Sequence, residues 1–166
     1  MQRLETQRLK LLPFTLELKK ITLSKRARLP EMLGVAMPDA WPGAEMLEAL
    51  PFFIEAMEKD PTGIVWDGII IHKAEEIAIG GIGFHGPPDE AGRVEIGYNI
   101  IPAYEWQGYA TEMARRVIDW AFQTPSIGVI TAECRDDNVG SIRVLEKVGM
   151  RRLPAEGHTL RWELQK

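Results

Sequence analysis

The sequence predicts a mixed α/β or α+β domain in which helices flank a mostly antiparallel sheet. Three β-rich runs, at 64–72, 76–84 and 93–101, are joined by short turn segments, which predicts an antiparallel meander. After residue 102 apolar residues recur at helical spacing, and helix-like and strand-like segments then alternate. Strands interleaved with helices are typical of a sheet whose faces are covered by helices.

The first 60 residues contain one predicted strand and two predicted helical regions. Residues 7–12 form the strand, which Pro13 ends, and 14–33 is an interrupted helical region. A breaker-rich loop at 37–43 carries Trp41. Apolar residues recur at helical spacing from Ala44 to Glu58, and Pro51 within that pattern indicates a kink or two abutting helices.

The second half predicts a helix over 108–123 and a buried strand over 128–133. Asn138 is a good N-cap for a helix that runs through Lys147, and Gly149 suits the position after its C-cap. The last strands are predicted at 150–153 and 159–165, which gives about seven strands in total.

The composition is that of an ordinary globular protein, and we expect residues 1–166 to form one domain. The net charge of -4 argues against a nucleic-acid partner, which selects a basic surface. Cys134 is the only cysteine, so an internal disulfide is excluded and a reducing compartment is expected. The N-terminal residues lack a signal-peptide core and no run is long enough to span a membrane, which predicts a cytoplasmic protein.

The segment from Val94 to Glu112 carries the clearest chemical signal. It reads as a strand, a short loop and a helix start with small residues at Gly108 and Ala110. Small side chains there let an anion approach the free backbone N–H groups, and the helix dipole favours negative charge. A pyrophosphate suits such a site, although the same small residues also permit close helix–sheet packing. The Lys-Ser/Thr element of a P-loop is missing.

Three stretches of the chain resemble the GCN5-related N-acetyltransferase (GNAT) superfamily, and in particular its branch of ribosomal-protein N-terminal acetyltransferases (RimJ/RimL-like). They are Glu-Thr-Gln-Arg-Leu at 5–9, the segment 95–112 with Gly-Tyr-Ala-Thr-Glu at its end, and Asn-Val-Gly-Ser-Ile-Arg-Val-Leu-Glu-Lys-Val-Gly-Met at 138–150. The three occur in the family's order. The resemblance covers nearly the whole chain and is sparse only between residues 15 and 60.

The resemblance implies a cofactor site for acetyl-coenzyme A, used as a co-substrate. The coenzyme A pyrophosphate would be held by backbone N–H groups of Gln107, Gly108, Tyr109, Ala110 and Thr111. The strand end at Ile100 and Ile101 would pair with the pantetheine arm, as an added strand would. Asn138 and Ser141 would contact the far side of the cofactor. The family splays the strand that ends at Ile101 from the strand near Gly128, which opens the slot where cofactor and amine meet.

The chain departs from the family pattern at several positions. Glu105 stands where the superfamily has Gln or Arg, and a carboxylate near a pyrophosphate is unfavourable. Met150 replaces the usual Phe, which is an apolar exchange. Leu145 occupies the position of the Tyr that protonates the departing thiolate in many members. The ribosomal-protein branch commonly lacks this Tyr and uses a Ser, for which Ser141 is the candidate here; a Ser in a first helical turn also serves as a cap.

An amine acceptor with a pKa of about 10 needs a base at neutral pH. Glu95, on the strand leading into the cofactor loop, is the candidate base, directly or through a water; alternatively it pairs with an Arg or caps backbone donors. His85 could shuttle a proton from the pocket or be an ordinary turn histidine. Trp41 could line the amine pocket and clamp a cation, or pack in the core. A covalent acyl-enzyme on Cys134 lacks a visible activating His, and no cluster has metal-ligand spacing.

These features predict an acyltransferase that moves an acetyl group from acetyl-coenzyme A to a primary amine, either a protein N-terminus or a small molecule. The alternative is a non-catalytic acyl-coenzyme A binding or sensing domain, which the Leu145 and Glu105 departures leave open. That alternative would gain if Glu95 lay far from the slot or were locked in a salt bridge. The resemblance is also compatible with a homodimer. No metal, nucleic-acid or membrane partner is expected.

Overall fold

The computed structural model describes residues 1–60, 62–154 and 157–166. Their backbone forms an eight-stranded sheet in the order β1-β2-β3-β4-β5-β6-β8-β7. The strands are β1 (Leu4–Glu5), β2 (Leu9–Pro13), β3 (Asp67–His72), β4 (Ile77–Phe84), β5 (Arg93–Ile100), β6 (Val129–Arg135), β7 (Arg151–Arg152) and β8 (Thr159–Gln165). The α-helices are α1 (Leu16–Ser24), α2 (Leu29–Leu33), α3 (Ala44–Lys59), α4 (Tyr109–Phe122) and α5 (Val139–Lys147), and the 3-10 turns are η1 (Arg26–Arg28) and η2 (Pro102–Tyr104).

The sheet is mostly antiparallel, and the predicted meander is confirmed. Strands β2, β3, β4 and β5 pair with one another in antiparallel register, and β6 pairs with β8 in the same manner. Among the strands of the described residues, the one parallel pairing joins the two halves of the sheet, where Arg93, Val94 and Glu95 of β5 lie beside Val129, Ile130 and Thr131 of β6. The mixed α/β fold class expected from the sequence is therefore the one observed.

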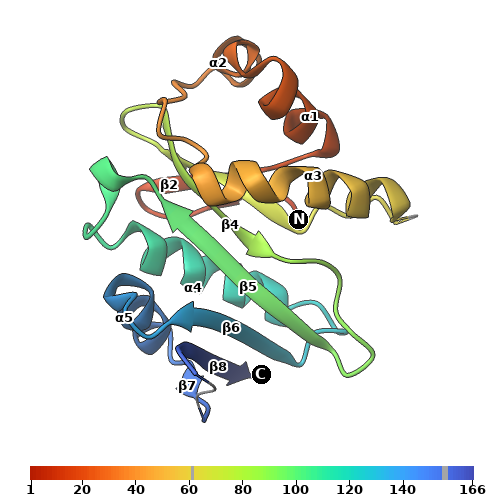
Figure 1. Ribbon diagram of the computed structural model, residues 1–166, viewed down its shortest axis with the longest axis vertical. Coiled ribbons are helices and arrows are strands. Elements are labelled where there is room, and N and C mark those ends of the chain that lie inside the picture. Colours follow the sequence, from red (N-terminus) through yellow and green to blue (C-terminus); the bar gives the residue numbers. More distant parts are fainter. Residues whose placement is uncertain (61, 155–156) are drawn as a thin grey trace.

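Helices cover both faces of the sheet, as Figure 1 shows with α3 in front of the strands and α4 behind them. Strand β3 is buried on both sides because its alternate residues enter different cores. Ile70 packs in the core under α4 and α5, while Ile69 and Ile71 pack in the core under α1 to α3. The α4 core side is the apolar stripe at helical spacing that includes Met113 and Val117, both fully buried.

Local sequence signals set the ends of α5 as expected. The Asn138 side chain accepts a hydrogen bond from the Ser141 N–H at 3.0 Å, which satisfies one free donor of the first turn. After the C-cap Val148, Gly149 has a φ of 86°, the left-handed conformation that glycine adopts at low cost. These caps place the first turn of α5 firmly beside β5 and β6.

Two expectations about the elements are corrected. Residues 44–59 form one continuous helix, so the interpretation of two abutting helices at Pro51 was wrong. Pro51 is exposed, and the carbonyl that loses its helical donor there can bond to water. The sheet also has one strand more than the seven expected, because the two-residue β1 pairs with β2 although it is too short to show periodicity.

None of the helices in the described ranges is long and apolar enough to cross a membrane.

Candidate active site

The strands β5 and β6 separate after a short parallel contact, and this opens a slot in the sheet. Within the described residues their pairing ends at Glu95 and Thr131. Beyond that point β5 remains paired with β4 on its other edge, through Ile100 and Gly80. The second half of β5 therefore has an open edge that faces β6.

The register decides which main-chain groups face the slot. The Ile101 N–H donates to the Ile79 carbonyl of β4 at 2.8 Å, and the Ile101 carbonyl accepts from the Tyr104 N–H at 2.9 Å. Because main-chain groups alternate between the two edges of a strand, Tyr98 and Ile100 turn theirs toward the slot. Of the two residues expected to pair with a pantetheine arm, only Ile100 has main-chain groups turned that way. The expectation for Ile101 is corrected in favour of Tyr98.

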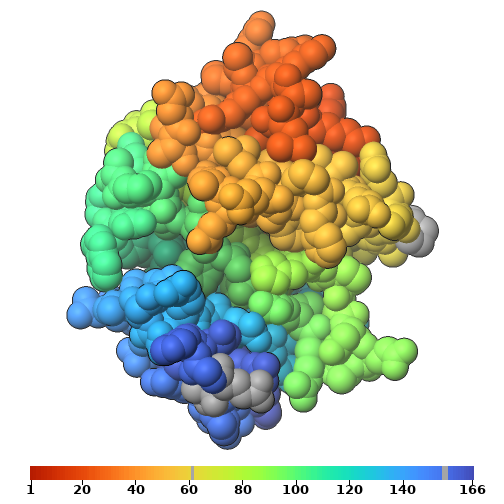
Figure 2. Space-filling view, viewed as in Figure 1, coloured from red at the N-terminus to blue at the C-terminus, as the bar shows by residue number. Residues whose placement is uncertain are grey.

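A cavity of about 760 Å³ follows the slot and continues beneath α3. Figure 2 shows the corresponding hollow between α3, in orange and yellow, and the blue segment that contains α5 and β6. Its lining brings together residues far apart in sequence, including Trp41, Phe53, Asp67, His85, Glu95, Tyr98, Glu105, Cys134, Asn138 and Ser141. Five of the candidate catalytic, cofactor-binding and pocket residues thus line one cavity, namely Trp41, His85, Glu95, Asn138 and Ser141, whereas Ile100, Ile101 and residues 107–111 are not in its lining.

The N-terminus of α4 offers free backbone donors. Gly108 is the N-cap with a φ of 82°, and no side chain caps the helix. The first intrahelical bond closes at the Glu112 N–H, so the N–H groups of Tyr109, Ala110 and Thr111 have no partner within the helix. A Cβ at Gly108 would meet only the guanidinium of Arg8, at 3.6 Å. The residues expected to hold a pyrophosphate therefore form an uncapped helix start with a cation beside it.

An N-terminal brace, formed by Thr6, Arg8 and Glu112, holds this helix start in place. Glu112 Oε1 accepts from Thr6 Oγ1 at 2.6 Å and from the Arg8 N–H at 3.0 Å. Glu112 Oε2 accepts from Arg8 Nε at 2.7 Å, and Arg8 Nη1 donates to the Gln107 carbonyl at 3.1 Å. Burial acts to raise the pKa of Glu112, but the hydrogen bonds from Thr6 and Arg8 outweigh it and hold that pKa below its usual value. The brace joins the N-terminal motif to the cofactor segment.

Tyr109 contributes only its backbone to the candidate anion site. Its side chain is buried, the guanidinium of Arg8 lies 4.3 Å from its ring centroid, and its hydroxyl lies 3.1 Å from His72 Nε2. His72 Nδ1 is buried without a hydrogen-bond partner in the described residues, and Glu75 Oε1 lies 3.2 Å from it. His72 thus belongs to the support of the helix start.

Tyr98 is a cavity residue that the sequence reasoning missed. It lies on the open half of β5, and its hydroxyl donates to the Ser141 carbonyl in the first turn of α5 at 3.3 Å. Burial raises the pKa of Tyr98 to about 12, so the hydroxyl keeps its proton at neutral pH. The signal that could have found it is the alternation along β5, which places its main chain on the same edge as Ile100.

Glu95 is the last residue of β5 that pairs with β6, so its side chain stands where the slot begins. Its Oε1 lies 3.3 Å from His85 Nδ1, and the two side chains are 40% and 52% exposed. A Cβ at Gly97 would come within 2.7 Å of His85 Nε2, so the imidazole lies over β5 beside Glu95. Glu95 is therefore at the slot, and its one ion-pair contact in the described residues is with a half-exposed histidine, which leaves it open to a ligand.

Trp41 forms part of the cavity wall and does not present a face to a cation. Its side chain is 1% exposed, it packs against Phe14 with ring centroids 5.7 Å apart, and Nε1 donates to the Gly80 carbonyl at 3.1 Å. The cation-clamp interpretation is thus replaced by core packing. The ring of Phe53 on α3 also lines the cavity, and it is half-buried and 6.3 Å from the His85 ring.

A buried ion pair closes the cavity beneath α1. Lys19 is fully buried, and its Nζ donates to Asp67 Oδ1 at 2.6 Å, to Asp67 Oδ2 at 2.8 Å and to the Phe14 carbonyl at 2.5 Å. The charge of the Asp67 carboxylate is therefore balanced by the Lys19 ammonium, although Asp67 lines the cavity. No group of three His, Cys, Asp or Glu side chains in the described ranges could hold a metal ion.

The splayed sheet, the cavity that follows its slot and the uncapped start of α4 are the candidate site of this fold. A family model described as "Acetyltransferase (GNAT) domain" matches residues 8–151, and the chain belongs to this family. It is an acyltransferase. The chain is also 36% identical over 147 residues, 88% of its length and 88% of the other, to the uncharacterized N-acetyltransferase YjdG of Bacillus subtilis.

Solved acetyltransferase structures share the fold. One is the ribosomal-protein-S5-alanine acetyltransferase from Vibrio fischeri, with a TM-score of 0.67, 16% identity and coverage of 99% of this chain and 97% of that chain. Another is the microcin C7 self-immunity acetyltransferase MccE in complex with acetyl-CoA and AMP. Its TM-score is 0.66 at 13% identity, over 97% of this chain and 94% of that one. At such identities the likeness concerns the fold, and it includes the ribosomal-protein acetyltransferases that the sequence resembles.

Proposed function

We propose that this protein is an N-acetyltransferase that transfers an acetyl group from acetyl-coenzyme A to a primary amine by direct attack. The observation that carries the proposal is the slot between β5 and β6, where Glu95 stands at the opening. The lining of its cavity extends to Glu105, which precedes the uncapped start of α4 in the chain. When bound, acetyl-coenzyme A supplies a thioester whose carbonyl carbon accepts the amine nitrogen. The chain's residues then have to bind, orient and move protons.

The chain offers separate groups for binding the donor. The uncapped N–H groups at 109–111, with Gln107 and Gly108 preceding them, favour a pyrophosphate, and Arg8 adds a positive charge nearby. The open edge of β5 at Tyr98 and Ile100 can pair with the amide groups of a pantetheine arm, as an added strand would. Glu105 lines the cavity but is exposed, so its carboxylate can turn toward water and away from the phosphates.

Proton movement is assigned to residues around the slot. Glu95 removes a proton from the acceptor ammonium, directly or through a water, and His85 at 3.3 Å can pass it toward solvent. The leaving thiolate accepts hydrogen bonds from the hydroxyl groups of Ser141 on α5 and Tyr98 on β5. It takes up the second proton, which the attacking nitrogen loses as the amide forms, through the Ser141 hydroxyl. Because the pKa of Tyr98 is about 12, its hydroxyl acts as a protonated hydrogen-bond donor throughout the neutral range.

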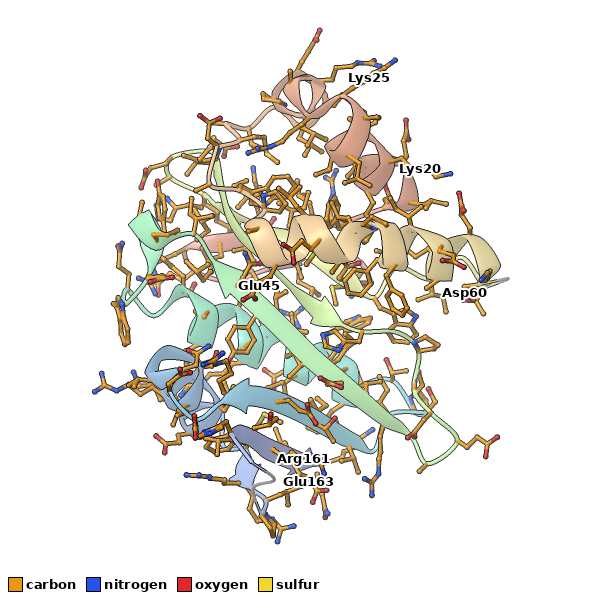
Figure 3. The ribbon with its side chains drawn as sticks, in the orientation of Figure 1. Lys20, Lys25, Glu45, Asp60, Arg161 and Glu163 are labelled. Atoms are coloured by element: carbon orange, nitrogen blue, oxygen red, sulfur yellow. The ribbon has the colours of Figure 1, made fainter. Side chains whose placement is uncertain are left out.

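The lining of the cavity favours a cationic acceptor. Glu45 of α3 and Glu95 of β5 line it with their carboxylates, while Glu133 of β6, also in the lining, is ion-paired with Arg161 at 3.3 Å. Figure 3 places Glu45 at the start of α3, where it lies over β5. Negative charge around the mouth attracts a protonated amine and raises its local concentration. The proposed acceptor is a small-molecule amine or a protein N-terminus. The same proposal includes that the protein forms a homodimer and is located in the cytoplasm.

The test is thiol release from acetyl-coenzyme A with a panel of amines: peptides with free N-termini, amino acids, polyamines and aminoglycosides. Glu95→Gln is compared with Glu133→Gln, because both carboxylates line the cavity and only Glu95 stands at the splay point. Turnover with at least one amine, reduced about 100-fold or more in Glu95→Gln and little in Glu133→Gln, supports the proposal. Donor binding without turnover on any amine, or equal losses in the two variants, contradicts it.

A further inference from the structure

Trp106 adopts a conformation that a tryptophan rarely occupies. It lies between η2 and α4 with a φ of 61°, in the left-handed region that favours glycine. Its side chain is 71% exposed, so core packing does not compensate this strain. A bulky exposed residue held in an unfavourable backbone conformation points to a role for its side chain.

The indole of Trp106 lies across the gap between the starts of α4 and α5. A Cβ at Gly140, in the first turn of α5, would lie 3.8 Å from Trp106 Cη2 and 4.0 Å from Cζ2. The guanidinium of Arg143, one turn further along α5, lies 5.8 Å from the centroid of the indole ring. The result is an exposed aromatic plane with an exposed guanidinium beside it.

This pair lies beside residues that line the cavity. Glu105, which precedes Trp106 in the chain, and Asn138 and Ser141 at the start of α5 are lining residues, whereas Trp106 and Arg143 are not. An aromatic face beside a guanidinium is suited to a planar base that carries a phosphate, because the base stacks and the phosphate pairs with the cation. A ligand with its thioester at Glu95 and its pyrophosphate at α4 would bring such a group to this pair.

We propose that Trp106 and Arg143 form a clamp for the nucleotide end of the coenzyme A donor, with Trp106 stacking on the adenine and Arg143 pairing with the 3′-phosphate. This inference rests on the proposed function, since it requires coenzyme A as the donor. Its consequence is a preference for intact coenzyme A over donors that keep only the phosphopantetheine part. The strain at Trp106 is retained because the indole serves the ligand and not the fold.

The test measures dissociation constants of coenzyme A, 3′-dephospho-coenzyme A and phosphopantetheine by calorimetry for four proteins. These are the wild type, Trp106→Gly, Arg143→Gln and Phe52→Ala, the last being a control that also removes an aromatic side chain, 70% exposed. Trp106→Gly is expected to weaken coenzyme A binding roughly 5- to 150-fold, as for one lost base–aromatic stack. Phosphopantetheine binding should be unchanged. The melting temperature of the free protein should be unchanged or higher, because Gly relieves the strained φ.

Arg143→Gln is expected to weaken coenzyme A binding but not binding of the dephospho form. The clamp is overturned if the wild type binds phosphopantetheine as tightly as coenzyme A. It is also overturned if Trp106→Gly weakens all three ligands equally, or no more than Phe52→Ala does; in these cases the proposed transferase function still stands. If the wild type binds none of the three ligands, the proposed function fails and the clamp fails with it.

Discussion

Removal of the Glu112 carboxylate tests whether the N-terminal brace holds the cofactor segment. Glu112→Ala loses the hydrogen bonds from Thr6 Oγ1 and the Arg8 N–H, as well as the ion pair with Arg8 Nε. Each hydrogen bond to a charged group contributes about 1.5 kcal/mol, while the half-exposed ion pair adds well under 1 kcal/mol. The expected loss is about 3 kcal/mol, which in a chain of this size lowers the melting temperature by about 6–12 °C.

The assay is thermal unfolding of the wild type, Glu112→Ala and Glu112→Gln, followed by circular dichroism. Glu112→Gln keeps one acceptor oxygen and should lose about half as much. A melting temperature of Glu112→Ala within about 2 °C of the wild type would refute the reasoning, because it would mean that these three contacts do not stabilise the fold. Acetyl-coenzyme A should also bind more weakly to Glu112→Ala, since the first turn of α4 is then less well fixed.

The same carboxylate gives a pH dependence of known sign. The pKa of Glu112 is lowered in the folded protein: burial alone would raise it, and the hydrogen bonds from Thr6 and Arg8 overcome that effect. A lowered folded pKa stabilises the fold at pH values above the unfolded pKa of about 4.3, and this contribution is lost as pH falls through the folded value. The stability difference between wild type and Glu112→Ala should therefore be full at neutral pH and decline in acid.

Three further substitutions have distinct expected outcomes. Lys19→Met leaves the Asp67 carboxylate without its buried partner and should lower the free energy of unfolding in urea by about 3–5 kcal/mol. Most of this loss should be recovered when Asp67→Asn is added, and no recovery would contradict the ion-pair account. Tyr98→Phe should lower kcat about 10-fold with little change in KM. The loss should be the same across roughly pH 7–10, because the pKa of Tyr98 is about 12, and an unchanged kcat would remove the hydroxyl from the mechanism. Gly97→Ala should displace the flexible His85 ring, at 2.7 Å from the new Cβ, and reduce turnover while shifting the melting temperature by less than about 3 °C; full activity would show that His85 is not needed.

Local signals made most of the fold predictable. The meander follows from three β-rich runs with short turns, and α5 follows from its apolar spacing, its Asn138 cap and Gly149 after its end. These features depend on residues close together in sequence, where propensity and capping act directly. The cavity residues Glu95, Asn138 and Ser141 could be chosen because they belong to such local segments.

The rest depends on contacts between distant segments. The brace joins Thr6 and Arg8 to Glu112 across more than a hundred residues, and only the sheet order brings them together. The choice of Tyr98 over Ile101 depends on the β4–β5 register, which shows whether the main-chain N–H and C=O groups of a residue face β4 or the slot. The choice between the two interpretations of Trp41, cation clamp or core packing, could not be made from the sequence, because a breaker-rich loop does not show which surface the indole covers.

The most direct test of the central claim is the pH dependence of acetyl transfer by the wild type and Glu95→Gln, with the best amine from the panel. Acetylated amine is quantified by mass spectrometry at saturating acetyl-coenzyme A. If Glu95 removes the ammonium proton, the defect of Glu95→Gln is large well below the acceptor's own pKa, which is about 8 for a peptide N-terminus and about 10 for an alkyl amine. It shrinks as pH rises past that value, where the amine is already neutral. A defect of the same size at every pH, or none at all, would contradict the assignment of Glu95 as the base.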